Sequence, residues 1–313
     1  MSFKRTPQVF GAAVNEVTLG TGENAVTIGG ENVMPLCSFD APLPHKTAVG
    51  VEISDLGIDR SVPGMAAYYA GAESIAELAK KAEAMEGADF VVLTFNGADP
   101  AGLNRSIEDC AALAKEAAEA ISCPLAIQGC KNLEKDTQLF EKLAETLQGK
   151  NVLFVSCREE NHKRLSAAVG IAYEQKLCAE SAVDINLAKQ LNVLVSQMGV
   201  RAENHVMNVG AAAAGYGYEY VASTLDRVRS AALAQNDTML QMPIITPVSG
   251  EAWSVKEAVV SEEDIPEWGS RETRGVQMEI ATAAAALAGG SDALILRHPQ
   301  SVKTVSRLIA ELM

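Results

Sequence analysis

The segment GAAAAGYGYEY, residues 210–220, contains a spacing that could do chemistry. Gly210 and Gly215 have the Gly-x-x-x-x-Gly spacing of a phosphate-binding P-loop, but Tyr216 occupies the position of its lysine. Gly217 follows where that loop needs a magnesium-binding serine or threonine. We therefore do not expect a nucleotide here. Four alanines between glycines form a surface without large side chains. Such a surface favours either close contact of a wide, flat ligand with the backbone or tight packing of a helix.

Other polar residues follow short apolar runs, where strands would end. Most are amides or hydroxyls, and the two carboxylates have no charged partner nearby in the sequence. No strand-end lysine suited to a Schiff base, no G-x-S-x-G elbow and no H-E-x-x-H helix occurs. We therefore expect a neutral, amide-rich rim that suits hydrogen bonding to a polar organic ligand better than acid–base catalysis. The candidates are Asn96, Gln128, Asn208, Arg297 and His298, with the carboxylates Asp55 and Glu180.

Histidines and cysteines do not show the spacing of metal ligands. The four histidines are scattered, and His205 falls inside a predicted strand, as an ordinary core histidine would. No C-x-x-C pair occurs, so neither a zinc site nor an iron–sulfur cluster is predicted. We expect reduced thiols in a cytoplasmic protein. The cysteines are Cys37, Cys110, Cys123, Cys130, Cys157 and Cys178.

The charge balance limits the classes of partner. The chain has 26 Lys plus Arg against 40 Asp plus Glu, a net charge of −14. Such a chain repels phosphate backbones, so we expect neither nucleic-acid nor anionic-membrane binding. No run approaches the ~20 apolar residues of a membrane span, and no signal peptide is recognised at the N-terminus.

Eight short apolar runs, each followed by an amphipathic helical pattern, would position these residues. The runs are mostly continuous rather than alternating, as in strands buried on both faces of a parallel sheet. Eight such units in about 265 residues predict an α/β fold, a (β/α)₈ TIM barrel, with a doubly wound open sheet as the alternative. The predicted strands cover residues 47–54, 88–95, 124–129, 151–156, 177–181, 204–209, 243–248 and 292–298.

The first 46 residues do not fit this repeat. NEVTLGTGENAVTIGG predicts two short strands joined by a turn, a β-hairpin. We therefore divide the chain into an N-terminal extension, residues 1–46, and a barrel, residues 47–313. The hairpin is expected either to plug the N-terminal face of the barrel or to serve as a docking edge for another chain.

Two long loops and most of the large aromatic residues are predicted on the C-terminal face, where barrel enzymes have their sites. The loops cover residues 55–73 and 249–269. Clustered aromatic residues indicate an interface or a large flat ligand, or only packing of the loops onto the rim. The residues concerned are Trp253, Trp268, Tyr68, Tyr69, Tyr216, Tyr218 and Tyr220.

Several stretches, in order along most of the chain, resemble a known family. They are NEVTLG…NAVTIGGENVMPLCSFD, VGVEISD, GYGYEY…DRVRSAAL, MPIITPVSGEAW and GVQMEIATAAAALAGGSDALILRHP. Together they resemble the small subunit of the corrinoid iron–sulfur protein, the δ subunit of the CO dehydrogenase/acetyl-CoA synthase system. Members of that family often carry an acidic residue, a proline and hydroxyl residues ahead of the GYG. Here residues 208–211 read Asn-Val-Gly-Ala, which leaves Asn208 as the polar contact.

The resemblance implies a non-catalytic barrel subunit in a heterodimer with a larger subunit that holds a [4Fe–4S] cluster. A corrinoid of the cobalamin type would lie between the two. It would take a methyl group from a methyltetrahydrofolate methyltransferase and deliver it to acetyl-CoA synthase/CO dehydrogenase, and a reductive activator would restore its cobalt ion. The implied corrinoid contacts are Asn96, Asn208, Gly210, Gly215, Tyr216, Gly217, Arg297 and His298, with no catalytic residue and no metal ligand in this chain.

Two other functions compete with this one. The first is a barrel methyltransferase that acts alone on a reduced pterin, with Asn96, Gln128 and Asn208 bonding the pterin and Asp55 anchoring its ring. The second is an ordinary metabolic barrel enzyme, such as an aldolase or a phosphate-binding isomerase. That function would need a lysine or a glycine-rich phosphate loop that the sequence does not show.

Overall fold

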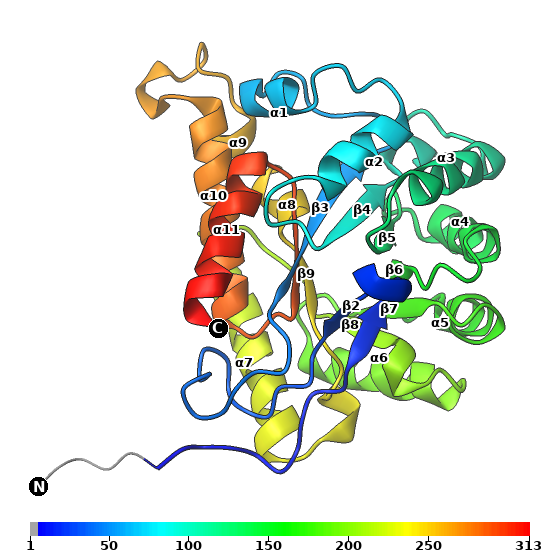
Figure 1. The fold of residues 1–313 in the computed structure, drawn as a ribbon, viewed down its shortest axis with the longest axis vertical. Coiled ribbons are helices and arrows are strands. Elements are labelled where there is room, and N and C mark those ends of the chain that lie inside the picture. Colours follow the sequence, from blue (N-terminus) through cyan, green and yellow to red (C-terminus); the bar gives the residue numbers. More distant parts are fainter. Residues whose placement is uncertain (1–5) are drawn as a thin grey trace, which may run out of the picture.

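The computed structural model describes residues 6–313, and its centre is a barrel of eight parallel strands (Figure 1). The strands are hydrogen-bonded in the order β8-β7-β6-β5-β4-β3-β10-β9. A parallel bridge between Met207 and Ile244, with the Met207 amide 2.7 Å from the Pro243 carbonyl, joins β8 to the start of β9. The barrel strands are β3 (Ala48–Ser54), β4 (Phe90–Thr94), β5 (Leu125–Gln128), β6 (Leu153–Cys157), β7 (Lys176–Glu180), β8 (His205–Asn208), β9 (Ile245–Pro247) and β10 (Ala293–Leu296).

This closure confirms the barrel and rules out the open, doubly wound sheet. Each predicted apolar run overlaps one strand, with bounds that agree to within three residues, and helical segments surround the strands (Figure 1). The helices are α1 (Pro63–Tyr68), α2 (Ile75–Glu83), α3 (Ile107–Ala120), α4 (Leu133–Thr146), α5 (His162–Leu165), α6 (Ile185–Gln197), α7 (Tyr218–Ala234), α8 (Val248–Ala252), α9 (Lys256–Val259), α10 (Arg271–Ala288) and α11 (Pro299–Leu312). A π-helical segment, Ser166–Ala172, continues α5, and short 3₁₀ turns cover Gly22–Asn24, Asn96–Ala98, Ala202–Asn204, Thr238–Leu240 and Pro266–Trp268.

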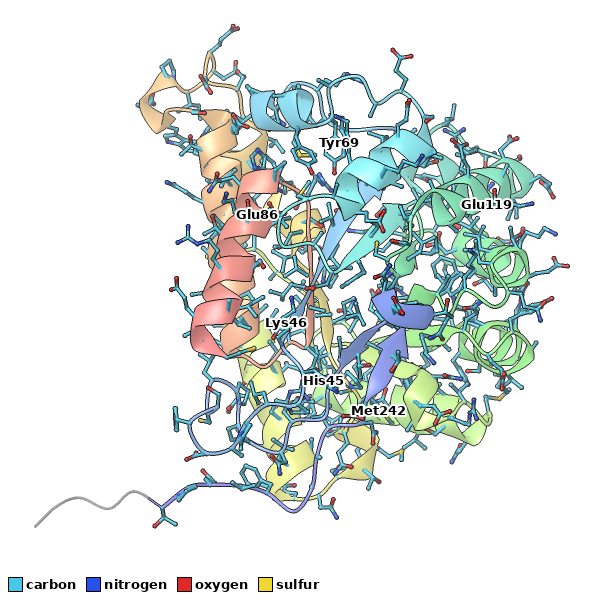
Figure 2. All side chains as sticks on the ribbon, viewed as in Figure 1. His45, Lys46, Tyr69, Glu86, Glu119 and Met242 are labelled. Carbon is cyan, nitrogen blue, oxygen red and sulfur yellow. The ribbon has the colours of Figure 1, made fainter. Side chains whose placement is uncertain are left out.

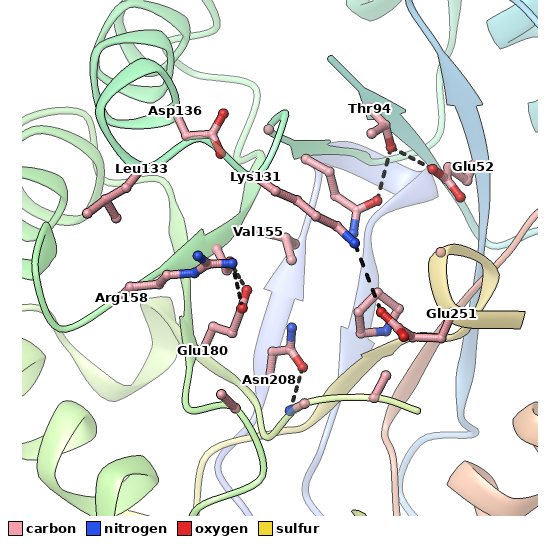
Figure 3. Close-up of a pocket in the computed structure, with 18 of the residues that line it drawn as sticks. Glu52, Thr94, Lys131, Leu133, Asp136, Val155, Arg158, Glu180, Asn208 and Glu251 are labelled. Atoms are coloured by element: carbon pink, nitrogen blue, oxygen red, sulfur yellow. Dashed lines mark hydrogen bonds and ion pairs between the residues drawn. The ribbon is translucent and has the colours of Figure 1, made fainter. Parts of the chain in front are cut away.

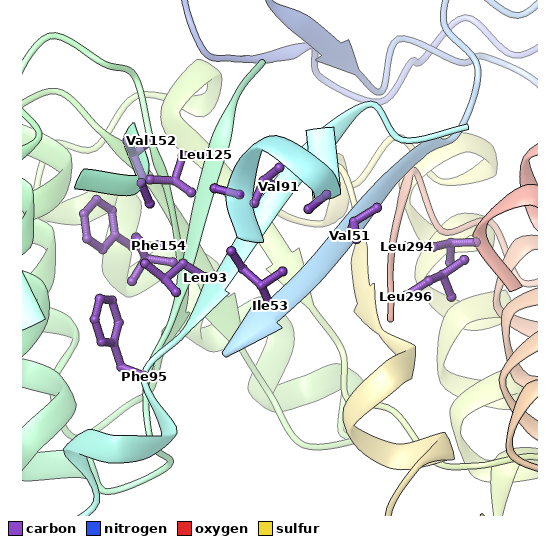
Figure 4. Close-up of a cluster of buried hydrophobic side chains, with 14 of the residues drawn as sticks. Val51, Ile53, Val91, Leu93, Phe95, Leu125, Val152, Phe154, Leu294 and Leu296 are labelled. Atoms are coloured by element: carbon purple, nitrogen blue, oxygen red, sulfur yellow. The ribbon is translucent and has the colours of Figure 1, made fainter. Parts of the chain in front are cut away.

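The main core lies between the barrel and its helices. Side chains that point outward from the strands, such as Val51, Leu93 and Phe154, pack against the apolar faces of the helices (Figure 4). The predicted capping box at the start of α2 is present, because the Ser74 side chain accepts from the Glu77 amide and Glu77 accepts from the Ser74 amide. Among residues 6–313, no helix is both long and apolar enough to cross a lipid bilayer.

The N-terminal hairpin fills the end of the barrel where the strands begin. Its strands, β1 (Val17–Leu19) and β2 (Val26–Ile28), pair antiparallel. Val17, Leu19 and Ile28 are fully buried and pack on inward-pointing strand residues such as Phe90. The Asn151 side chain donates to the carbonyls of Thr18 and Gly20, both at 2.8 Å. The plug interpretation is therefore confirmed, because the apolar face of the hairpin is used inside this chain.

A buried group of charges lies beside the plug. The guanidinium of Arg229, on α7, is 1% exposed and lies 2.5 Å from Asp292 and 3.2 Å from Glu31. It also donates to the Gly290 carbonyl. Burial and the neighbouring charge of Asp292 raise the pKa of Glu31 to about 8, although Arg229 acts against them. Figure 2 shows His45 and Lys46 toward the end of the barrel that holds the hairpin, and Tyr69 toward the opposite end.

His205 is an ordinary buried histidine, as its place in a predicted strand indicated. It begins β8, is fully buried, and neither ring nitrogen has a hydrogen-bond partner within residues 6–313. Because burial penalises the charged ring, the pKa of His205 is lowered to about 4. The side chain is therefore neutral in the folded protein near pH 7.

Candidate functional site

The inside of the barrel changes from apolar to polar along the strands. The lower layers, above the hairpin, are apolar, whereas the last inward-pointing residues of most strands are polar. These polar residues line a cavity of about 450 Å³ that opens at the C-terminal end of the barrel (Figure 3). The residues of this polar layer are Glu52 (β3), Thr94 (β4), Gln128 (β5), Glu180 (β7), Asn208 (β8) and, just after β10, Arg297. We call this space the mouth cavity.

Glu52 is the most enclosed charged group of the mouth cavity. One carboxylate oxygen lies 3.0 Å from the Thr94 hydroxyl. The other accepts from the Arg297 guanidinium at 3.0 Å and from the Ser249 hydroxyl. Burial acts to raise the pKa of Glu52, but the charge of Arg297 and the hydrogen bonds outweigh it and hold that pKa below its usual value. Glu52 is therefore ionised and fixed in orientation.

A second ion pair lies across the cavity from Glu52. Glu180 accepts from the Arg158 guanidinium at 2.9 Å and from the Ser156 hydroxyl. Beside it, the Asn208 side-chain oxygen accepts from the Gly210 amide at 2.9 Å, which fixes the start of the loop after β8. The Asn208 amide nitrogen has no partner among residues 6–313 and lines the cavity as a free donor (Figure 3).

Lys131 and Glu251 approach each other across the opening. Lys131 follows β5 and Glu251 belongs to α8, and their charged ends are 4.0 Å apart (Figure 3). Both side chains are solvent-exposed, so this contact is weak and open to displacement by a ligand.

Asp136, on α4, is the remaining carboxylate of the cavity wall. It accepts from the Cys130 amide at 2.8 Å, and burial raises its pKa despite these bonds. An added Cβ at Gly129 would lie 2.2 Å from this carboxylate, so glycine is needed for the loop to pass so close. Burial also raises the pKa of the Cys130 thiol to about 12, so Cys130 is not a reactive thiolate.

The structure brings together four of the eight predicted corrinoid contacts. Asn96, Asn208, Gly210 and Arg297 line the mouth cavity. The other four, Gly215, Tyr216, Gly217 and His298, do not.

The residues of the GYG segment lie on the rim. Gly217 has a left-handed backbone, φ 85°, and precedes the first turn of α7. Tyr216 borders a shallow hollow floored by Ala212 and Ala213, and its hydroxyl lies 2.5 Å from Glu257. An added Cβ at Gly215 would meet nothing within 4 Å, so no packing contact inside the chain requires glycine there.

His298 points away from the cavity. It is buried, its ring stacks on Trp253 with centroids 5.8 Å apart, and Nε2 lies 2.9 Å from Glu272. The amide of Gln300 donates to Nδ1, so Nε2 carries the proton and donates to Glu272. This histidine fixes the start of α11 and the β9–α10 loop instead of facing a ligand.

The expectation of a neutral rim is wrong. Among the lining residues of the mouth cavity are four carboxylates and three cationic side chains. Sequence reasoning missed five of them, and four of these five have partners that are distant along the chain. One signal was available, since Glu52 interrupts the apolar run VGVEIS as a lone carboxylate. The missed residues are Glu52, Lys131, Asp136, Arg158 and Glu251.

Asp55 does not serve as an anchor in the cavity. Its side chain is buried, pairs with Arg105 at 2.9 Å and accepts from the Gly97 amide at 2.8 Å. It does not line the mouth cavity. The pterin interpretation therefore loses the carboxylate that was to hold the pterin ring.

The aromatic residues of this face divide into two groups. Trp253, Tyr69 and Tyr218 are buried and pack the long loops onto the barrel. Tyr216 and Tyr220 are exposed on the β8–α7 side of the rim. Large apolar side chains are also exposed in other loops of the C-terminal face, namely Leu56, Leu103 and Val259. The packing expectation is thus confirmed for the buried residues, and an interface or ligand at the exposed tyrosines stays a prediction.

The mouth cavity lacks the two side chains that most often bind transition metals. Neither a histidine nor a cysteine is among its lining residues. Within residues 6–313, no group of three or more His, Cys, Asp and Glu side chains is arranged to hold a metal ion. The small residues Gly210 and Ala211 at its edge, with Ala212 and Ala213 beyond them, form a low surface.

Comparisons with known proteins agree with this architecture. The family model of the CO dehydrogenase/acetyl-CoA synthase delta subunit matches residues 16–303. The acetyl-CoA decarbonylase/synthase complex subunit delta of Archaeoglobus fulgidus is 30% identical over 295 residues, which is 92% of this chain and 64% of the relative. The corresponding subunit of Methanothermobacter thermautotrophicus is 29% identical, with 94% and 75% covered. The chain thus spans a little under two thirds of the length of the first of these relatives.

Solved structures with a similar fold are dihydropteroate synthases. The enzyme from Vibrio fischeri superposes with a TM-score of 0.57 at 11% identity, covering 94% of this chain and 97% of that one. The enzyme from Xanthomonas albilineans gives a TM-score of 0.54 at 13% identity, with 95% and 98% covered. At these identities the likeness shows the barrel fold alone.

Proposed function

The chain belongs to the CO dehydrogenase/acetyl-CoA synthase delta subunit family, and we propose on that premise that it covers a corrinoid in a methyl-transfer complex. The observation that carries the proposal is the mouth cavity, a polar opening without a histidine or cysteine, flanked by a low surface of glycine and alanine. A bound corrinoid would supply the cobalt ion that holds the methyl group. The chain itself is a non-catalytic carrier subunit in this proposal.

Three features of the mouth would hold and orient the ring. The free amide nitrogen of Asn208 is placed to donate to an amide oxygen at the corrin periphery. Gly210 and Ala211 let the ring come close to the backbone. Asn96, whose side chain donates to the Ser54 hydroxyl at 3.0 Å, lines the far side.

The proposed partner is a larger subunit that carries a [4Fe–4S] cluster and holds the other face of the corrinoid. Exposed apolar side chains around the mouth support a partner on this face, since such residues are enriched at interfaces. The methyl donor would be a methyltetrahydrofolate methyltransferase and the acceptor acetyl-CoA synthase/CO dehydrogenase, with a reductive activator for the cobalt ion. These partners must reach the same mouth in turn, so the contact between barrel and corrinoid must open and close. The residues of the apolar rim are Leu56, Leu103, Tyr216, Tyr220 and Val259.

The test is co-expression with the large subunit from the same genome and purification of the complex. We expect a one-to-one complex with the absorption spectrum of a corrinoid. The variant Ala211→Trp should reduce corrinoid retention at least tenfold, because the indole would occupy the low surface beside the cavity. Ala101→Trp, in an exposed part of the β4–α3 loop away from the cavity, should retain it fully. A chain that never binds the partner or a corrinoid would contradict the proposal.

The competing enzyme hypothesis is tested in the same preparation. The isolated chain is given methyltetrahydrofolate and free cob(I)alamin, and methyl transfer is followed by the loss of the cob(I)alamin absorbance. We expect no transfer above the rate without protein, because Asp55 is turned away from the cavity. Transfer by the isolated chain would favour the methyltransferase instead.

A further inference from the structure

Glu52 and Arg297 form an ion pair at the inner end of the mouth cavity. They come from adjacent strands, β3 and β10, which pair in parallel. The pair lines both the mouth cavity and a neighbouring hollow beneath the loop after β3. The Glu52 side chain is 6% exposed and that of Arg297 30% exposed, so the cation is the more accessible member.

We propose that this ion pair sets the reduction potential of the cobalt ion in a corrinoid that lies over the mouth. The inference rests on the proposed function, because it assigns a role to two residues of the same site. It concerns charge alone, since neither side chain is needed as a cobalt ligand.

The sign of each contribution follows from electrostatics. A bound corrinoid that gained one electron from an external reductant would carry one unit less charge. A fixed negative charge nearby therefore disfavours reduction, whereas a fixed positive charge favours it. Such effects are larger at the end of a covered cavity than in open water, because the effective dielectric constant is lower.

The structure holds the carboxylate in place by more than the ion pair. The hydroxyls of Thr94 and Ser249 both contact Glu52, and these contacts do not involve Arg297. At a pH that keeps Glu52 ionised, replacing Arg297 thus leaves a negative charge still positioned under the mouth. Replacing Glu52 removes the carboxylate that pairs with the Arg297 guanidinium in the cavity and makes the local charge more positive. The two single substitutions should shift the potential in opposite directions.

Four variants of this chain test the inference in the complex with the large subunit, loaded with corrinoid. They are Glu52→Gln, Arg297→Gln, the double variant, and the matched control Asp55→Asn. Asp55 is also a buried carboxylate paired with an arginine after β3, but it does not line the mouth cavity. The measurement is a spectroscopic titration of the cobalt(II)/cobalt(I) ratio with titanium(III) citrate.

At a fixed applied potential, Glu52→Gln should raise the fraction of cobalt(I) relative to cobalt(II) about tenfold, equivalent to a shift of about +59 mV for one electron. Arg297→Gln should lower the ratio by a similar factor. The double variant and Asp55→Asn should stay within about twofold of the unchanged chain. A purely structural role of the pair would not give shifts of opposite sign.

If Glu52→Gln folds poorly, Glu52→Asp is a second variant that changes the length of the side chain and keeps its negative charge. It should leave the cobalt(II)/cobalt(I) ratio near that of the unchanged chain, even if it lowers the unfolding temperature. The inference is overturned if both single variants retain corrinoid and shift the ratio in the same direction, or not at all. Failure of the unchanged complex to hold any corrinoid would instead overturn the proposed function, and this inference with it.

Discussion

At the N-terminal end of the barrel, Arg229 and two carboxylates are enclosed beside an apolar plug, whereas at the C-terminal end Glu52 and Arg297 face an open cavity. Both ends bury an arginine–carboxylate pair, but Arg229 is 1% exposed and Arg297 is 30% exposed. A buried pair in an enclosed site serves the fold, since breaking it leaves an uncompensated charge in low dielectric. A pair at a cavity remains available to a ligand. The difference separates the end that stabilises the fold from the end where we propose that a ligand binds.

The largest expected effect comes from breaking the enclosed pair. Arg229→Met leaves Glu31 and Asp292 buried without a cation and should lower the free energy of unfolding by about 3–5 kcal/mol. Arg297→Met should cost less than about 2 kcal/mol, because water reaches that side chain. Urea unfolding followed by circular dichroism measures both. Equal losses would show that the two ends do not differ as described.

The same variant has a pH signature. The pKa of Glu31 is raised to about 8, above its usual 4.5, so its contribution to stability is full below pH 4.5 and is lost as pH rises through about 8. Removing Arg229 raises that pKa further, so the deficit of Arg229→Met should be constant between pH 5 and pH 7 and should grow above about pH 8. A deficit independent of pH would mean that Glu31 is not buried beside this arginine.

The next effect comes from the plug. Ile28→Ala removes a fully buried side chain from the layer between the hairpin and the barrel and should cost about 2–5 kcal/mol. Thr18→Ala, on the exposed side of the same hairpin, should change stability by less than about 0.5 kcal/mol. If the two variants were equally stable, the hairpin would be an appendage and not part of the core.

A third prediction concerns acid stability at the enclosed end. His205 has a pKa of about 4 in the folded chain and about 6.5 when unfolded, so it favours folding fully above pH 6.5 and loses that contribution as pH falls through about 4. Between pH 7 and pH 5 this residue should account for a loss of about 2 kcal/mol. His205→Phe should reduce the fall in the free energy of unfolding between pH 7 and pH 5, measured by urea unfolding at each pH. If the variant loses as much stability between these pH values as the unchanged chain, other residues cause the acid sensitivity.

The sequence was sufficient for the strands and the hairpin plug, but it indicated neither the buried charges at the enclosed end nor the ion pair at the open end. The apolar runs located every barrel strand because burial on both faces leaves a local signal. Glu52 is a single carboxylate within such a run, and its partner Arg297 is 245 residues away, so no local pattern connects them. The orientation of His298 was nevertheless accessible. Ile295 points inward, so alternation places Arg297 inward and His298 outward.

The smallest expected change in stability is that of a variant at the open end, which tests ligand binding apart from stability. Lys131→Ala removes the 4.0 Å contact with Glu251, and because both side chains are solvent-exposed the stability should change by less than about 1 kcal/mol. The opening of the mouth cavity, however, loses the cation that spans it. If the mouth receives a ligand, the association rate of corrinoid with the apo complex, measured by stopped-flow absorbance, should change severalfold while unfolding does not. The exposed Lys142→Ala, which breaks a 2.8 Å contact with Glu145 on α4, is the matched control and should alter neither quantity. A change in both quantities for Lys131→Ala would mean that the Lys131–Glu251 contact supports the fold, and the division between the two ends would then be less sharp than the structure indicates.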